Sequence, residues 1–266
     1  MKITTWNINS VRLRMPLVAR FLQAHAPDVI CLQETKCRDA EFPSADFRAL
    51  GYGHLAIHGQ KGYHGVAIAS KHPLRVIENR DFCAVGHARH IAVELEAGGA
   101  PLKLHNFYVP AGGDEPDAAI NPKFAHKLDF LDEMTEWIKS ERIADGRVVL
   151  AGDLNIAPLE HDVWSHKALL KIVSHTPVEV EKLKRVFDAG EWIDSLRRFV
   201  PENEKLYTWW SYRAADWALS DRGRRLDHIL VSDALGGALT GLDILREARG
   251  WERPSDHVPV SIELAL

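Results

Sequence analysis

Short apolar runs rich in β-branched residues recur along the chain and alternate with fewer, longer segments of helical periodicity. Alternation with period two is typical of a half-buried strand. The last run shows it most clearly, because its apolar side chains fall on one face of an extended chain: Val258, Val260, Ile262 and Leu264. On this basis we predict strands at residues 2–6, 28–33, 64–70, 90–96, 102–108, 147–151, 226–232 and 258–264.

Three segments instead repeat apolar residues with the 3.6-residue period of an amphipathic helix. The first starts at Pro16, where proline favours a helix N-terminus, and the last stops before Gly190, a residue common just after helices. We predict helices at 16–25, 123–142 and 179–189. Many strands with helices scattered between them favour an α/β fold in which two sheets pack together with helices outside.

The composition is that of a globular protein, because 46% of the 266 residues are hydrophobic and 26% are charged. We find no linker or repeat, so we expect one domain over residues 1–266 and interpret the loose segment 109–122 as a functional loop inside it. A net charge of −4 excludes a histone-like binder. The three cysteines lack C-x-x-C spacing, which predicts a reduced, cytoplasmic protein.

Polar residues gather at the ends of the predicted strands. In chain order they are Asn7, Asn9, Glu34, Tyr108, Asp153, Asn155, Asp227, Asp256 and His257. In mixed sheets, the C-terminal ends of some strands and the N-terminal ends of others share an edge. These groups can therefore lie along one rim of the protein, on loops held by a rigid scaffold.

The residue types at these strand ends suit hydrolysis of a phosphate ester. Glu34 and Asp256, with amide oxygens of Asn7 or Asn155, supply the hard oxygen ligands that Mg²⁺ prefers. The His, Asp and Tyr side chains supply a base for water and donors to phosphoryl oxygens. Each residue alone also has a structural explanation, such as a tight turn. Their joint occurrence at separate strand ends favours an active site.

Six stretches of the chain resemble, in family order, the exonuclease III class of abasic-site endonucleases within the endonuclease/exonuclease/phosphatase superfamily. They are ITTWNINSVRLR, PDVICLQETKC, HNFYVP, GDLNIAP, RLDHILVS and PSDHVPV. Together they span essentially the whole chain. The resemblance implies a DNase I-like, four-layer α/β sandwich, with two mixed β-sheets face to face and helices outside.

The resemblance also implies Mg²⁺ as the cofactor, with Mn²⁺ as an alternative ion. Glu34 is then the principal carboxylate ligand, with Asn7 in its shell, and Asp256 binds a second ion or the same ion through water. The implied metal set is Asn7, Glu34, Asp153, Asn155, Asp256 and His257. The number of ions, one or two, stays open.

The implied catalytic residues are Tyr108, Asp153, Asn155, Asp227 and His257. Asp153 orients or deprotonates the attacking water, while Asn155 and Tyr108 donate to the phosphate. Asp227 holds His257 by a hydrogen bond that fixes its tautomer or charge. Whether Asp153 or His257 is the general base stays open at this point.

A basic and aromatic segment at 197–225 bears on the substrate. Seven Lys or Arg residues face four Asp or Glu residues there, and six aromatic residues are interleaved. Basic groups track phosphates and aromatic rings can line a pocket for a flipped nucleotide, although a packed cluster with a solvated charged face has the same composition. The family resemblance favours DNA, and the implied DNA-binding residues are Asn9, Arg12, Arg89, Lys123, Trp209 and Leu226.

Three positions depart from the family pattern. Ala111 stands where relatives usually carry Gln or Asn, so backbone amides of Gly112 or Gly113 are candidates for the missing phosphate contact. Arg224 replaces an aromatic residue that lines the abasic pocket in some relatives. Asn9 replaces an Asp near the metal.

The implied function is a Mg²⁺-dependent DNA repair nuclease that cuts 5′ of abasic sites, with 3′–5′ exonuclease and 3′-phosphodiesterase activity. Its expected partner is double-stranded DNA with abasic sites or blocked 3′ ends, bound by a monomer with no membrane association in the bacterial cytoplasm, at the nucleoid. The alternatives are another phosphoesterase of the superfamily or a non-catalytic DNA-binding scaffold. Histidines that lie close together in the sequence suggest a zinc site as a further hypothesis, but the sequence contains no H-E-x-x-H motif.

Overall fold

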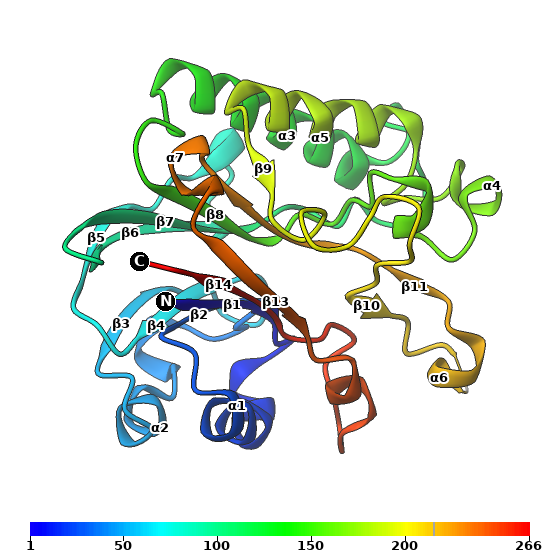
Figure 1. Ribbon diagram of the computed structural model, residues 1–266. Helices are drawn as coiled ribbons and strands as arrows, with labels where there is room; N and C mark the ends of the chain where they lie inside the picture. Colours follow the sequence, from blue (N-terminus) through cyan, green and yellow to red (C-terminus); the bar gives the residue numbers. More distant parts are fainter. Residues whose placement is uncertain (215) are drawn as a thin grey trace.

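The fold consists of four layers (Figure 1). The structure is a computed structural model that describes residues 1–214 and 216–266. Helices α3 (Pro122–Ser140) and α5 (Pro177–Ala189) cover the outer face of one six-stranded sheet. Helices α1 (Val11–His25) and α2 (Ser44–Ala49) cover the outer face of the other sheet. This arrangement confirms the predicted α/β sandwich with helices outside.

The first sheet has the strand order β13-β14-β1-β2-β4-β3. Strands β1 and β2 run parallel, and every other neighbouring pair in this sheet is antiparallel. The bounds are β1 (Lys2–Asn7), β2 (Val29–Gln33), β3 (His54–His58), β4 (Val66–Ser70), β13 (Leu239–Ile244) and β14 (Val260–Leu264).

The second sheet has the strand order β5-β6-β7-β8-β12-β9. Strands β7 and β8 are its parallel pair, so each sheet is mixed in the same way. The bounds are β5 (Leu74–Glu78), β6 (His90–Ala97), β7 (Ala100–Tyr108), β8 (Val148–Asp153), β9 (Ile193–Asp194) and β12 (Asp227–Val231).

A two-stranded ribbon projects from one end of the sandwich, together with α6 (Figure 1). It pairs β10 (Trp209–Trp210) with β11 (Gly223–Arg224). The remaining short helices are α4 (His166–Leu169), α6 (Trp217–Ser220) and α7 (Asp233–Gly236), with 3₁₀ turns at Asp39–Glu41, Phe82–Ala84, Glu160–Asp162 and Arg246–Gly250. Within the described residues, no helix is both long and apolar enough to cross a membrane.

The inner faces of the two sheets form the central hydrophobic core, where side chains such as Ile3, Val93 and Val149 are fully buried. Polar side chains also meet across this core, where Gln33 of β2 donates to Asn106 Oδ1 at 2.7 Å. Asn106 of β7 donates hydrogen bonds to the backbone carbonyls of Leu32 (3.0 Å) and Ala67 (2.9 Å) in the opposite sheet. Because buried polar groups are costly unless they are hydrogen-bonded, this link fixes how one sheet sits on the other.

The eight predicted strands are all present, with ends that differ by at most two residues. The predictions missed β3, β5, β9 and β13, which are the four edge strands of the two sheets, and the β10–β11 ribbon. Edge strands face solvent and carry polar residues, so their hydrophobic pattern is weak. The helix predicted at 16–25 begins at Val11 instead, because the chain leaves helical geometry at Arg14 and thereby accommodates Pro16 inside the helix.

Candidate active site

The polar strand ends of both sheets meet at one rim. Asn7 ends β1 and Glu34 directly follows β2, and these two strands are parallel. In the other sheet, Tyr108 ends β7 opposite Asp153, which ends the parallel strand β8. Asp227 begins the antiparallel strand β12 and pairs in register with Asp153. The strand directions alone therefore bring these residues to one edge.

Asn7 joins the carboxylates of the two sheets. Its Nδ2 donates to Glu34 Oε1 (2.9 Å) and to Asp153 Oδ2 (2.8 Å), while its Oδ1 accepts from the backbone N–H of Asn9 (3.1 Å). Asn7 was predicted in the metal shell, but in this orientation it presents an amide nitrogen to the carboxylates. It therefore holds Glu34 and Asp153 together, and its place in the metal shell stays a prediction.

His257 lies between two buried aspartates. Its Nδ1 is 2.8 Å from Asp227 Oδ2, and its Nε2 is 3.6 Å from Asp153 Oδ2. Thr208 donates its hydroxyl to the same Asp227 oxygen at 2.6 Å, which orients that carboxylate. The indole of Trp6 donates to the backbone carbonyl of His257. The side chains of His257, Asp153 and Asp227 are at most 5% exposed, so water screens their charges little.

Burial and charge shift the pKa values of this group in opposite directions. Burial alone would lower the pKa of His257, but the Asp227 and Asp153 carboxylates outweigh it and raise the pKa to about 10. Burial raises the pKa of Asp153 to about 7, and the Asp227 and Glu34 carboxylates add to this against the opposing effect of His257. His257 is therefore an imidazolium at neutral pH, while Asp153 titrates near neutrality.

Glu34 is held in an unusual backbone conformation and paired with a lysine. Its φ of 50° lies in the left-handed region, which costs a residue with a Cβ about 1–3 kcal/mol. Lys36 Nζ lies 2.8 Å from Glu34 Oε2 and also donates to Asn9 Oδ1 (2.6 Å). Burial would raise the pKa of Glu34, but Lys36 lowers it below its usual value. The sequence predictions missed Lys36, although it lies within the quoted QETKC stretch.

Asn155 and Tyr108 border Asp153. Asn155 Nδ2 donates to Asp153 Oδ2 (3.1 Å) and to the carbonyl of Val109 (2.9 Å). Burial, followed by the Glu34 and Asp153 carboxylates, raises the pKa of Tyr108 well above its usual value, so the phenol keeps its proton and remains a donor. Arg89 is 6% exposed and donates to the Tyr108 carbonyl at 3.1 Å. It supports Tyr108, and its phosphate contact stays a prediction.

A buried ion pair positions the loop that carries Asn155. Lys127 of α3 lies 2.5 Å from Glu179 of α5, and both side chains are fully buried. The same Lys127 Nζ donates to the carbonyl of Asn155 (2.8 Å) and to that of Ala111 (3.3 Å). The helix layer is thereby connected to two loops of the site. The sequence analysis predicted this helix from its apolar residues alone and therefore did not identify Lys127.

A cleft of about 730 Å³ opens beside these residues. The predicted pocket residues Trp209 and Leu226 line it together with Glu34, Asn155 and His257. Two hydrogen bonds hold Asp256 at this cleft, from Trp209 Nε1 (2.9 Å) and Asn9 Nδ2 (3.2 Å). Three predicted phosphate contacts are not among the residues that line the cleft: the buried Arg89, Arg12, which is half exposed beside Glu41, and Lys123, which is exposed at the start of α3.

The site can hold a metal ion. Among the described residues, Asp153, Asp227 and His257 place ligand atoms within 4.8 Å of one another. Because His257 Nδ1 is already bonded to Asp227, the oxygens of Glu34 and Asp153 are the better ligands. Four carboxyl groups lie at this rim with three cationic side chains, an excess of acidic oxygens that suits a hard divalent cation: Glu34, Asp153, Asp227 and Asp256 with Lys36, His257 and Arg89.

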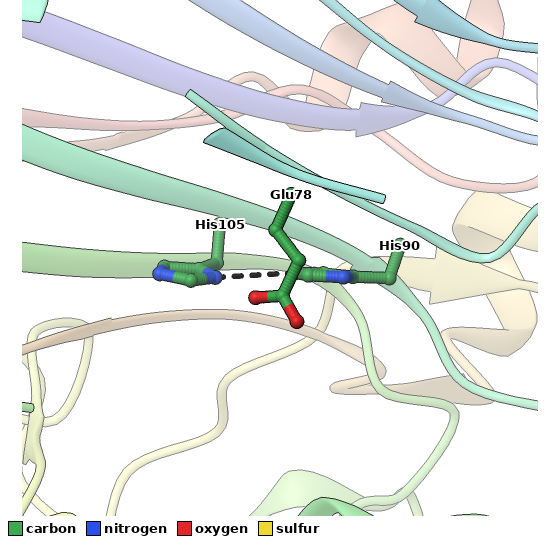
Figure 2. Close-up of side chains that lie close together, drawn as sticks. All are labelled: Glu78, His90 and His105. Atoms are coloured by element: carbon green, nitrogen blue, oxygen red, sulfur yellow. Dashed lines mark hydrogen bonds between the residues drawn. The ribbon is translucent and has the colours of Figure 1, made fainter. Parts of the chain in front are cut away.

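A second group of ligand-type side chains lies away from this rim (Figure 2). His90 Nε2 is 3.1 Å from His105 Nδ1, with Glu78 beside the pair. The backbone N–H of Arg80 donates to His90 Nδ1, so the ring proton of neutral His90 is on Nε2 and donates to His105. Burial lowers the pKa of both histidines. With both nitrogens of His90 engaged, the group is a buried hydrogen-bonded pair rather than an open metal site.

Comparison with known proteins places the chain in a family. Residues 4–257 match the Endonuclease/Exonuclease/phosphatase family. The exodeoxyribonuclease III of Haemophilus influenzae is 33% identical over 99% of both chains, and the DNA repair nuclease APEX1 of Danio rerio is 30% identical over 100% of this chain and 83% of its own. The chain belongs to the endonuclease/exonuclease/phosphatase family, as its motifs predicted.

Solved structures agree over the full length. An AP endonuclease from Archaeoglobus fulgidus is 31% identical with a TM-score of 0.90, and it covers 100% of both chains. A 3′ phosphatase from Neisseria, bound to a product DNA hairpin, is 34% identical with a TM-score of 0.88 over 100% of both chains. Within the family, the chain is therefore similar to nucleases of the exodeoxyribonuclease III and AP endonuclease type.

The charge of His257 provides a test of this geometry. The Asp227→Asn variant removes the carboxylate that raises the histidine pKa most, so the pKa should fall by about one pH unit or more. A histidine whose pKa is raised on folding stabilises the folded state. This stabilisation is complete below the pKa of the unfolded chain, about 6.5, and is lost as the pH rises through the pKa of the folded protein. The variant should therefore be less stable than the wild-type protein at neutral pH. NMR titration of the His257 ring in metal-free protein measures the shift.

The matched control is Asp233→Asn, at an exposed carboxylate in the first turn of α7. It should leave the His257 titration unchanged. An unaltered His257 pKa in the Asp227→Asn variant would contradict the ion pair.

Proposed function

We propose that the protein is a Mg²⁺-dependent DNA repair nuclease. It cuts 5′ of abasic sites in double-stranded DNA and also acts as a 3′–5′ exonuclease and 3′-phosphodiesterase. The observation that carries the proposal is the convergence of Glu34, Asp153 and His257 beside a cleft lined by Trp209 and Leu226. The similarity to an exodeoxyribonuclease III and to AP endonucleases supports this substrate class.

Glu34 and Asp153 would hold the metal ion, with Asp256 contacting the same ion through water or a second one. When bound, the ion supplies positive charge to the developing negative charge on the phosphate. Mg²⁺ needs only one or two protein carboxylates and keeps several waters, which matches a site whose carboxylates come from separate loops. Mn²⁺ is the alternative ion.

The protonation states separate the roles of the two candidate bases. His257 is already protonated at neutral pH, so it can donate to a phosphoryl oxygen but cannot accept a proton from water. In the metal-free protein burial raises the pKa of Asp153 to about 7, and its carboxylate can accept a proton where the imidazolium cannot. We therefore assign Asp153 as the residue that orients and deprotonates the attacking water. Asn155 and Tyr108 would donate to the phosphate.

The proposal for DNA binding places the flipped abasic sugar against Trp209 and Leu226. Trp209 is held by its bond to Asp256, and Leu226 is 4% exposed at the base of the cleft, so both surfaces are preorganised. Exposed basic side chains such as Arg12 and Lys123 would contact flanking phosphates as the duplex crosses the rim. We propose that a monomer in the bacterial cytoplasm carries out the reaction.

The direct test is a duplex oligonucleotide with one tetrahydrofuran abasic analogue, incubated with Mg²⁺ and then with excess chelator. We expect a single nick 5′ of the analogue that leaves a 3′-hydroxyl and disappears when the metal is removed. Gel electrophoresis with end-labelled strands measures the products. Binding without nicking would support a non-catalytic scaffold, and the absence of both would point to another phosphate ester.

The Asp153→Asn variant tests the assignment of the base. An amide cannot accept the proton of water, so kcat for abasic incision should fall by about 10²-fold or more, the usual scale for loss of a general base. DNA binding measured by fluorescence anisotropy should change little. The control is Asp145→Asn at the surface, where the carboxylate pairs with Arg142 and its side chain is 60% exposed. Near-normal turnover in Asp153→Asn would remove Asp153 from this role.

A further inference from the structure

Two arginines of the projecting ribbon lie over tryptophan rings in the cleft. The guanidinium carbon of Arg224 is 5.2 Å from the ring centre of Trp209, and that of Arg222 is 4.8 Å from the ring centre of Trp164. All four side chains line the same cleft as the catalytic residues. Because side chains alternate along an extended chain, Arg222 and Arg224 point to one side and Gly223 to the other.

The close approach of Tyr207 explains the glycine between the two arginines. A Cβ at Gly223 would overlap the Tyr207 ring. The ring therefore packs directly against the ribbon backbone and keeps both arginine side chains on the cleft side.

The Arg224–Trp209 pair is rigidly positioned. Arg224 Nη1 donates to the carbonyl of Val173 (2.9 Å) and to Ser174 Oγ (2.7 Å). Trp209 Nε1 is fixed by Asp256 at 2.9 Å. The Nε of Arg224 is buried and has no hydrogen-bond partner among the described residues. The pair is therefore held in one position at the cleft, so a ligand that binds there requires little reordering of these two side chains.

A guanidinium over an indole offers a nucleobase two planar groups. Bases stack on aromatic side chains and on arginine planes, and they carry acceptors for N–H donors. A deoxyribose ring has neither a planar face nor base acceptors. The cleft volume of about 730 Å³ falls within the roughly 300–1,000 Å³ typical of pockets for small organic ligands, so it has room for a whole nucleotide.

We propose that Arg224 and Trp209 form a nucleobase subsite for the 3′-terminal nucleotide removed in the exonuclease reaction, with Arg222 and Trp164 as a second wall. The inference rests on the proposed nuclease function and specifies its substrate. The backbone of Trp209 pairs with that of His257, so the base lies next to the catalytic histidine. Water attacks the terminal phosphorus, the P–O3′ bond breaks, the preceding sugar oxygen takes a proton, and a nucleoside 5′-monophosphate leaves.

Two variants of Arg224 separate the flat surface from the charge. Arg224→Lys keeps the positive charge and loses the plane, while Arg224→Leu loses both. We measure kcat/KM with Mg²⁺ for a recessed 3′ end with an intact nucleotide and for a duplex with an internal tetrahydrofuran. In both variants the ratio of the first value to the second should fall by about fivefold or more, the low end of the effect of losing one stacked base.

The matched control is Arg213→Leu, which removes the same charge from a residue of the same cleft that lies over no indole in the described part of the chain. Its substrate ratio should stay within about twofold of the wild-type ratio. Equal losses on both substrates in the Arg224 variants, or retention of the wild-type ratio in Arg224→Lys, would overturn the subsite.

Product inhibition gives a second readout that does not depend on exonuclease turnover. Deoxyadenosine monophosphate and deoxyribose 5-phosphate are compared as inhibitors of tetrahydrofuran incision. The wild-type protein should bind the nucleotide at least about fivefold more tightly, and Arg224→Leu should bring the two inhibition constants together. Equal inhibition of the wild-type protein would contradict the subsite alone, whereas a wild-type protein that cuts no DNA would contradict the proposed function itself.

Discussion

The face-to-face packing of the two sheets is the constraint on which the site depends, because neither sheet alone contains it. Glu34 comes from one sheet and Asp153 and Asp227 come from the other. Burial of the inner faces is favourable by roughly 25 cal/mol per Å² of apolar area, but it does not by itself fix how one sheet lies on the other. The Asn106 bonds across the core and the Asn7 bridge at the rim supply that specificity.

The rim combines buried charges that would be unstable apart. Leaving one member of a buried ion pair without its partner costs several kcal/mol, so each carboxylate there has a partner. Asp227 has His257 and Thr208, Glu34 has Lys36, and Asp256 has two neutral donors. Asp153 shares His257 with Asp227 at the longer distance of 3.6 Å, and burial is the main cause of its raised pKa. The least compensated group is thus the one best suited to bind a cation or accept a proton.

The sequence predicts the centre of this protein better than its edges. Strands such as β2 and β8 are buried throughout and read as continuous apolar runs, whereas β5 and β13 alternate weakly because solvent covers one side. The polar residues at the strand ends could be identified because ordinary turns do not explain so many carboxylate, amide and imidazole side chains at separate strand ends. Lys36 and Lys127 were not identified, because a lysine is usually exposed. Lys36 pairs with Glu34 through the local backbone turn, and Lys127 pairs with Glu179 through tertiary packing. The position of Arg224 over Trp209 also depends on tertiary structure, because it requires β10 and β11 to pair.

Location of the metal ion tests the central claim most directly. Crystals of the protein grown with Mn²⁺ and measured at an anomalous wavelength show where the ion binds. The account predicts an anomalous peak within coordination distance of the Glu34 carboxylate and next to Asp153, at the rim where the two sheets meet. A peak at the Glu78, His90 and His105 group without one at Glu34, or no peak at either position, would contradict it.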